Sequence, residues 1–172
     1  RFDVLWEYKA VFGIGVLGTL GLTGISMLIG LILGIPVGIG RLSQSRFIKF
    51  LSGAFIEVFR DTPIIVQLVW VYYCFPILTG IRLSAWTAAI LAMSVHATAY
   101  LAEVYRAGIG SIDKGQIEAS RAVGMSRWQS MKRIILPQAI QRVLPPMLNV
   151  FADFMKASAL CSIIGVWELF RQ

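Results

Sequence analysis

The feature that most constrains this chain is a series of long stretches without a charged residue. Residues 10–40, 62–81 and 83–102 contain no Asp, Glu, Lys or Arg. A helix of about 20 residues crosses a hydrocarbon core of about 30 Å, so each stretch is long enough to span a membrane. The first stretch is longer than a straight crossing requires, which predicts a tilted helix. We therefore expect an all-α, polytopic membrane protein.

The composition supports the same class. Hydrophobic residues make up 57% of the chain and charged residues 15%, which is too apolar for an ordinary soluble domain. Pro145 and Pro146 are expected to interrupt the last span, which is the least hydrophobic. We expect one transmembrane domain over residues 1–172, with spans at about 10–41, 53–79, 83–109 and 134–157.

Basic residues are distributed unevenly between the expected loops. The loop between the second and third spans offers only Arg82. By the positive-inside rule, the two basic loops lie in the cytoplasm and the N-terminus lies outside. The net charge of +7 therefore orients the protein, and no nucleic-acid binding is expected. The basic residues that follow the first and third spans are Arg41, Arg46, Lys49 and Arg60, then Arg106, Lys114, Arg121, Arg127, Lys132, Arg133 and Arg142.

Glycines recur through the first span at spacings that favour close packing between helices. The first three formally spell GxGxxG, but no strand precedes them, so a dinucleotide site is not expected. We expect small-residue stripes on this helix, formed by Gly15, Gly18, Gly21 and Gly24, then by Gly30, Gly34 and Gly38.

The segment that reads SIDKGQIEASRAVGMSRWQSMKRIILP, after the third span, predicts two short helices. Asp113 is expected to cap the first helix, with Gln116 at the reciprocal position, and Gly124 to end it in a left-handed turn. Ser126 is expected to cap the second helix, with Gln129 completing a capping box. We expect the two helices to meet at the glycine.

Apolar side chains within this basic segment leave two interpretations. Ile117, Val123, Met125 and Trp128 stand among charged residues. The segment is either an amphipathic element resting on anionic membrane lipid or a plug for a partner protein. The residues alone leave these two alternatives balanced.

The same segment contains Glu118-Ala119-Ser120, Gly124 and Ile134-x-Leu136-Pro137. Together these residues resemble the EAA signature of ATP-binding cassette (ABC) importer permeases. The resemblance implies the type I ABC importer transmembrane fold, with about four to five spanning helices and a cytoplasmic coupling segment at 111–133. It also implies a final family helix that is missing after residue 172. Stretches that resemble the polar amino acid branch are residues 57–63, 99–103, 106–109, 114–116 and 134–139.

The resemblance implies the membrane subunit of an amino acid importer in the bacterial inner (plasma) membrane. Glu118, Ala119, Gly124, Met125 and Trp128 are then expected to couple the spans to a cytoplasmic ATPase dimer, which binds ATP and Mg. The other implied partners are a second permease subunit, identical or homologous, a periplasmic or surface binding protein, and the amino acid itself. We expect no enzyme activity and no cofactor in this subunit, because the sequence has no GxxxxGK[ST] phosphate loop.

Metal binding is not expected either. Cys74 and Cys161 stand among apolar residues without CxxC or Cys/His spacing, so we interpret both as small packing residues.

Polar residues within the spans are candidates for a substrate pathway. Asp153 and Lys156 either meet the ammonium and carboxylate of an amino acid or neutralise each other at i and i+3. His96 is either a hydrogen-bonded packing residue or a side chain facing the pathway. Tyr100 and Glu103 follow on the same span and are further candidates.

Two other classes of protein stay open. An ion-coupled secondary transporter would use Asp153, Glu103 and His96 as a proton relay and would need no ATPase. A non-transporting membrane scaffold would gain nothing from charges within a span. Transport that depends on a co-purifying ATPase separates the importer from both alternatives.

Overall fold

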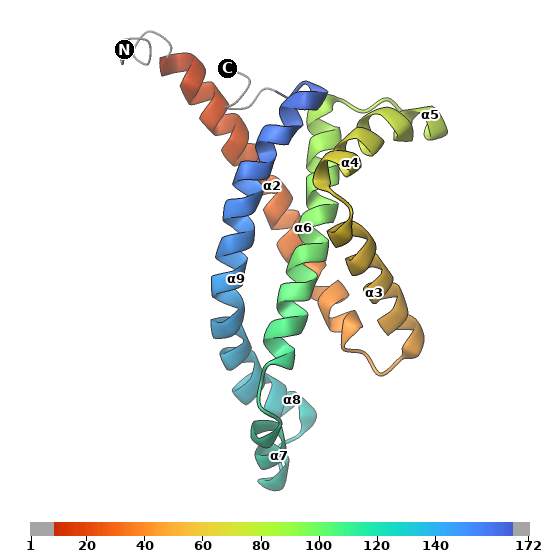
Figure 1. Ribbon diagram of the computed structural model, residues 1–172. Coiled ribbons are helices and arrows are strands. Elements are labelled where there is room, and N and C mark those ends of the chain that lie inside the picture. The colour runs from red at the N-terminus through yellow and green to blue at the C-terminus, as the bar shows by residue number, and fades with distance from the viewer. Residues whose placement is uncertain (1–8, 167–172) are drawn as a thin grey trace.

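The computed structural model describes residues 9–166, and every regular element in this part of the chain is helical. Helices α2 (Lys9–Arg41), α6 (Ala85–Gly110) and α9 (Leu136–Ala157) run along the length of the molecule (Figure 1). Three described stretches are long and apolar enough to cross a membrane, and a bent pair of helices adds a fourth if it counts as one span. The expected all-α, polytopic architecture is confirmed.

A stripe of glycines brings α2 close to α6. Gly30, Gly34 and Gly38 are all buried. A Cβ atom built on Gly30 would lie 2.6 Å from the Cβ atom of Ala97, and one on Gly38 would lie 2.7 Å from the Ala102 carbonyl oxygen. Any larger side chain would push the helices apart, so the predicted close packing at these glycines is confirmed.

Gly21 and Gly24 of α2 do not make this contact within the chain. Cβ atoms built on Gly21 and Gly24 meet nothing within 4 Å. At 3.6 residues per turn, both lie outside the buried face of α2, which contains Thr23 and Ser26.

A sharp bend divides the second predicted span. The helices before and after the bend meet at 99°. Pro63 explains the break, because proline lacks an N–H group and disfavours helical backbone at the residue before it. Thr62 accordingly has φ −82° and ψ 123°. The elements of this segment are α3 (Arg46–Asp61), α4 (Ile64–Val69), the π-helical η1 (Trp70–Cys74) and α5 (Phe75–Thr79).

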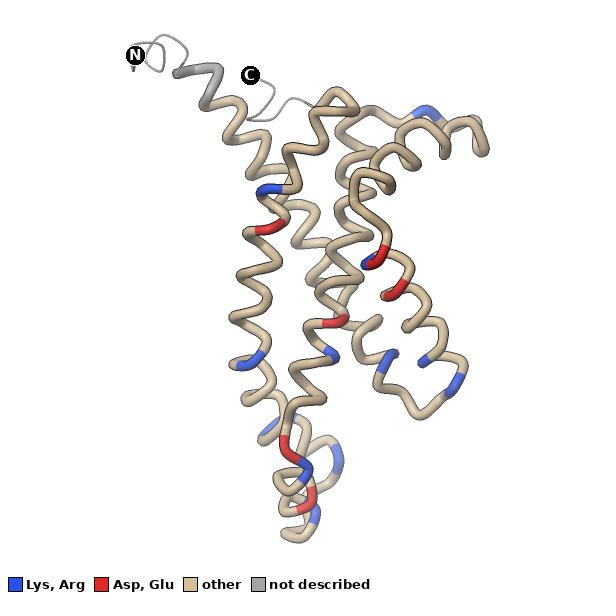
Figure 2. The backbone as a smooth tube through the Cα atoms, in the orientation of Figure 1, with Lys and Arg blue, Asp and Glu red and all other residues tan. Residues whose placement is uncertain are grey.

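Two short helices make the connection between α6 and α9. They are α7 (Lys114–Ala122) and α8 (Arg127–Ser130), and the π-helical turn η2 (Met131–Ile135) leads from α8 into α9. They lie at the end of the molecule away from residues 9 and 166 (Figure 1). Most charged residues lie in the half of the molecule near these helices (Figure 2).

The last long helix corrects one expectation. Pro145 and Pro146 lie inside α9, which continues without a break to Ala157. Each proline removes only its own N–H donor, and a membrane helix tolerates that loss where neighbouring groups satisfy the freed carbonyls. The 3-10 helix η3 (Ser158–Ile164) then ends the described chain, with Gly165 at φ 91°.

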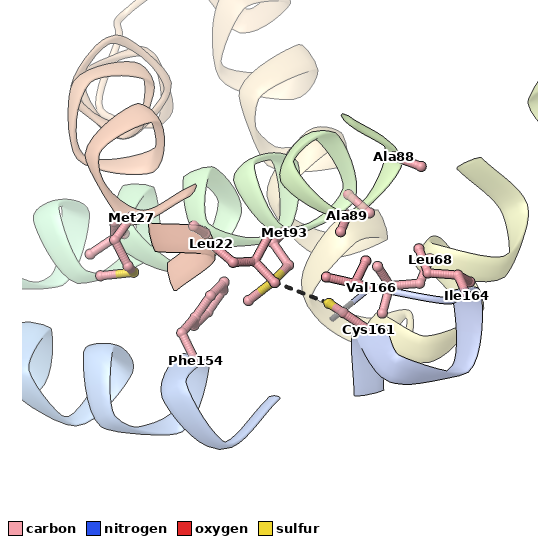
Figure 3. Packing of buried hydrophobic residues seen from close by; sticks show 13 residues of the cluster. Leu22, Met27, Leu68, Ala88, Ala89, Met93, Phe154, Cys161, Ile164 and Val166 are labelled. Carbon is pink, nitrogen blue, oxygen red and sulfur yellow. Dashed lines mark hydrogen bonds between the residues drawn. The ribbon is translucent and has the colours of Figure 1, made fainter. Parts of the chain in front are cut away.

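The buried core lies where α2, α4, α6 and α9 come together with η3. Leu22, Met93 and Leu101 are fully buried there. Figure 3 shows the Cys161 thiol pointing at the Met93 sulfur, 3.5 Å away. Cys161 is buried and contacts Met93, which fits the expected packing role.

Candidate coupling and transport sites

The predicted left-handed turn after the first short helix is confirmed. Gly124 has φ +80°, and its N–H donates to the Arg121 carbonyl at 2.9 Å. At the start of α7, the Asp113 carboxylate accepts a hydrogen bond from the Gly115 N–H at 2.6 Å. This is one residue earlier than the capping box predicted with Gln116, so Asp113 caps the helix without the predicted reciprocal geometry.

The second short helix begins with the predicted capping box. The Ser126 hydroxyl accepts from the Gln129 N–H at 3.3 Å, and the Gln129 side-chain oxygen accepts from the Ser126 N–H at 2.8 Å. Both bonds satisfy N–H groups that have no partner within the helix, which fixes its first turn.

A buried pair of hydroxyls joins the two short helices. The oxygens of Ser120 and Ser130 lie 2.5 Å apart, and both side chains are buried. Ser120 also donates to the Ile117 carbonyl at 2.7 Å. A hydroxyl carries a single hydrogen, so Ser130 is the donor to Ser120. We call residues 113–130 the α7–α8 hairpin.

The two long helices that flank the hairpin are tied to each other. Arg142 of α9 donates hydrogen bonds to both the carbonyl and the hydroxyl oxygen of Ser111, which follows α6. The ends of α6 and α9 are therefore joined to each other beside the hairpin.

The tip of the hairpin exposes the residues that the sequence singled out for coupling. Glu118, Ala119 and Gly124 are exposed, and Met125 is half-buried. The Trp128 side chain is 72% exposed, although burial of this large ring would be strongly favourable. An exposed large aromatic side chain is typical of a protein-binding surface.

A buried amide, which the sequence analysis did not single out, holds the bend of the second span. The Gln67 Nε2 atom lies 2.9 Å from the carbonyl oxygens of both Phe59 and Thr62. These carbonyls belong to the last turn of α3, where a helix end leaves acceptors without an internal partner. The signal in the sequence is that Gln67 is the single Asn or Gln in the charge-free run that follows Asp61.

His96 of α6 is packed against the same bend. Its Nδ1 atom lies 2.8 Å from the Gln67 Nε2 atom. Its ring packs in a tilted arrangement against Tyr100 and Phe154, with centroid distances of 4.8 Å and 5.6 Å. With 8% of its surface exposed, His96 has the geometry of a hydrogen-bonded packing residue.

Three candidate pathway residues form one row along α6, since His96, Tyr100 and Glu103 are spaced by one helical turn each. The Arg60 guanidinium lies over the Tyr100 ring at 5.3 Å from its centroid. Glu103 accepts two hydrogen bonds from Arg106, at 2.6 and 2.8 Å, and lies 4.0 Å from Arg60.

The other two candidates lie on a different surface. Lys156 donates to the Asp153 carboxylate at 3.2 Å, and their side chains are 78% and 73% exposed. Phe154, between them in the sequence, is buried against His96, so the charged pair faces away from α6. The structure therefore brings His96, Tyr100 and Glu103 together but does not bring Asp153 and Lys156 to them.

The described residues form a helical membrane domain with an exposed helical hairpin at one end. Residues 26–172 match the family described as binding-protein-dependent transport system inner membrane component. The chain belongs to this family.

Relatives and a solved structure support the same assignment. The probable amino-acid ABC transporter permease protein YckA of Bacillus subtilis (strain 168) is 41% identical over 181 residues, 98% of this chain and 79% of the relative. The glutamine transport system permease protein GlnP of Escherichia coli (strain K12) is 35% identical over 175 residues, 100% of this chain and 80% of the relative. A crystal structure of an amino acid ABC transporter with histidines has a TM-score of 0.94 at 37% identity, covering 100% of this chain and 80% of that one. The expected fold class, the type I ABC importer transmembrane fold, is confirmed.

Proposed function

We propose that this chain is the permease subunit of an ABC importer that carries amino acids across a bacterial inner membrane. Its relatives include a probable amino-acid permease and a glutamine permease. The observation that carries the proposal is the α7–α8 hairpin, exposed at one end of the bundle and locked by the bond between Ser120 and Ser130. Neither a secondary transporter nor a scaffold needs such an element.

The hairpin would couple this subunit to a dimer of ATPase subunits. Glu118 offers a carboxylate to a basic partner residue, while Met125 and Trp128 offer apolar surface to a groove. Ala119 keeps the contact face small, and Gly124 allows the elbow between the helices. ATP and Mg would be bound and hydrolysed by the partner subunits, and this subunit contributes movement of its spans rather than catalysis.

The distribution of charge supports an orientation for this subunit. Most basic residues lie in the half of the molecule that contains the hairpin (Figure 2). By the positive-inside rule this end lies in the cytoplasm, where the ATPase is, and the N-terminus lies outside. A periplasmic or surface binding protein would then deliver the amino acid to the opposite end.

The exposed ion pair on α9 supports a substrate pathway that runs along the outward face of this helix. A charged pair facing lipid is costly, so Asp153 and Lys156 are expected to face a second permease subunit or a water-filled pathway. There the carboxylate can meet the ammonium of an amino acid, and the lysine can meet its carboxylate. His96, Tyr100 and Glu103 would support the pathway from α6.

The test of the proposed function is amino acid uptake by proteoliposomes that contain the permease, its ATPase and its binding protein. Trp128→Ala is expected to abolish most uptake and most binding-protein-stimulated ATP hydrolysis, because the hairpin loses its main apolar contact. Tyr73→Ala is the control, since Tyr73 is an exposed aromatic residue on the bent segment, far from the hairpin. Uptake that continues without ATP, or that Trp128→Ala leaves unchanged, would show that the assignment is wrong.

The substrate role of the ion pair has its own test. Asp153→Asn and Lys156→Gln are each expected to raise the KM for uptake. The double variant Asp153→Lys/Lys156→Asp exchanges the two charges. The two side chains still attract each other, but the positions of the positive and negative groups that a zwitterion would meet are reversed. If the exchanged pair transports normally, the two residues only neutralise each other.

A further inference from the structure

A polar cavity lies where the end of α2 and the length of α3 approach α6. It has a volume of about 420 Å³, and its charged lining residues are Arg41, Lys49, Glu57, Arg60, Glu103 and Arg106. Glu103 and Arg106 belong to the last two turns of α6, so the cavity lies in the half of the bundle near the α7–α8 hairpin. The cavity is separate from the α7–α8 hairpin, because none of its lining residues lies within residues 113–130.

The charges that line this cavity do not balance. The Glu57 carboxylate pairs with Arg41 at 2.9 Å, and the Glu103 carboxylate makes its two short hydrogen bonds to Arg106. Arg60 reaches Glu103 only at 4.0 Å, and Lys49 has no ion pair with any residue from 9 to 166. Two positive charges, those of Arg60 and Lys49, are therefore left without a close carboxylate.

Of these two cations, Arg60 is partly withdrawn from water, with a side chain that is 38% exposed, whereas Lys49 is exposed at the mouth of the cavity. Partial burial of unbalanced positive charge is unfavourable, and an anion with several oxygen acceptors would offset it. Guanidinium and ammonium groups match the oxygens of a phosphate in charge and hydrogen-bond geometry.

The surroundings of the cavity indicate the source of the phosphate. Beside Lys49, α3 exposes Phe47, Phe50 and Leu51. A helix that presents basic groups on one side and large apolar side chains on another is suited to the boundary between headgroups and acyl chains. Basic pockets between spanning helices at the cytoplasmic side bind anionic lipid headgroups in other membrane proteins.

We propose that this cavity binds the phosphate of an anionic phospholipid headgroup. Lys49 and Arg60 contact the phosphate oxygens, while the acyl chains lie along the apolar surface of α3. Because α3 leads directly into the bend at Pro63, a bound lipid would also hold this segment in place. Lipid binding does not depend on the transported substrate, so its outcome can be distinguished from a failure of the proposed amino acid uptake.

The experiment uses the full permease in complex with its ATPase, purified in detergent. Binding of dioctanoyl phosphatidylglycerol is titrated and followed by native mass spectrometry, with dioctanoyl phosphatidylcholine as the zwitterionic comparison. One Lys or Arg near anionic lipid contributes about 1 kcal/mol, so Lys49→Gln is expected to weaken phosphatidylglycerol binding about fivefold. Lys49→Arg is expected to bind as the wild type does.

The matched control is Arg46→Gln, which removes the same charge from the exposed start of α3, outside the cavity. It is expected to change the affinity by less than about twofold. If Arg46→Gln and Lys49→Gln weaken binding equally, the attraction is that of a general basic surface and the proposal is overturned. Equal binding of phosphatidylcholine would also overturn it, since the headgroup charge would then play no part.

A competition with inorganic phosphate separates a lipid from a soluble anion. Phosphatidylglycerol is expected to stay bound when inorganic phosphate is added at the same concentration, because the acyl chains contribute to its affinity. Complete displacement at equal concentration would overturn the assignment to a lipid.

Discussion

The Nε2 atom of Gln67 lies 2.8 Å from the Nδ1 atom of His96, and this contact joins the bent second span to the middle of α6. The same amide nitrogen lies within hydrogen-bond distance of two carbonyls at the end of α3. His96 in turn packs on Phe154 of α9. The bend is therefore held in place by three helices rather than by Pro63 alone.

Substitution of Gln67 by leucine is expected to destabilise the folded subunit. The side chains are similar in size, but the carbonyls of Phe59 and Thr62 lose their donor, and an unsatisfied buried acceptor costs about 1–3 kcal/mol. The melting temperature of the complex in detergent measures the effect. Gln141→Leu, at an exposed position of α9, is the control and is expected to leave the melting temperature unchanged. Equal melting temperatures for the two variants would contradict the role of Gln67.

A double-mutant cycle is expected to reveal the bond within the hairpin. Ser120→Ala and Ser130→Ala should each destabilise it, because each leaves the other hydroxyl buried without this partner. The double substitution should cost less than the sum of the two, with a coupling of about 0.5–1.5 kcal/mol. Thermal unfolding of the four proteins gives this coupling. Strict additivity would mean that the two hydroxyls do not interact.

Gly124→Ala is expected to weaken coupling to the ATPase through the backbone alone. A Cβ atom at this position meets nothing within 4 Å, but alanine at φ +80° is strained by about 1–2 kcal/mol. Gly124→Asn should restore much of the uptake, because asparagine adopts the left-handed conformation more readily. ATP-driven uptake by reconstituted complexes is the measurement.

Gly110→Ala is the matched control for the hairpin glycine. Gly110 ends α6, and a Cβ atom there also meets nothing within 4 Å, but its φ is not positive. Alanine at this position should be neutral or slightly stabilising. If Gly110→Ala impairs uptake as much as Gly124→Ala does, the left-handed conformation is not the reason for the defect.

The close approach of α2 to α6 predicts opposite effects for two glycine substitutions. Gly30→Ala should cost about 1–3 kcal/mol, because the new methyl group collides with Ala97. Gly24→Ala should be neutral or stabilise α2 by up to about 1 kcal/mol, because its position is open and alanine favours helix. Melting temperatures of the assembled complex distinguish the two. A stabilising Gly30→Ala would show that the helices are not in tight contact.

Local chemistry made the α7–α8 hairpin predictable. The Ser126–Gln129 capping box and the left-handed Gly124 depend on contacts between residues at most five positions apart, so the order of residue types is enough to specify them. The charge-free stretches likewise predict long apolar helices from composition and length alone. Gly30, Gly34 and Gly38 were predicted as a packing stripe because their spacing puts them on one face of a helix.

Other features depend on residues that are distant in the sequence. Pro63 marks the bend, but Gln67 and His96, which hold it, are 29 positions apart. Ser120 and Ser130 come together only because the chain reverses between them. The continuity of α9 through Pro145 and Pro146 depends on packing and not on the proline preference, which favours a break.

The class of protein, the long helices and the caps of the hairpin can therefore be predicted from the order of residues, because periodicity, hydrophobicity and capping act over a few residues. Which polar residues meet depends instead on how the helices pack. Packing of Phe154 on His96 sets the rotation of α9 and turns Asp153 and Lys156 outward. A helix with apolar residues on several faces does not specify its own rotation, so that choice comes from the helices packed against it.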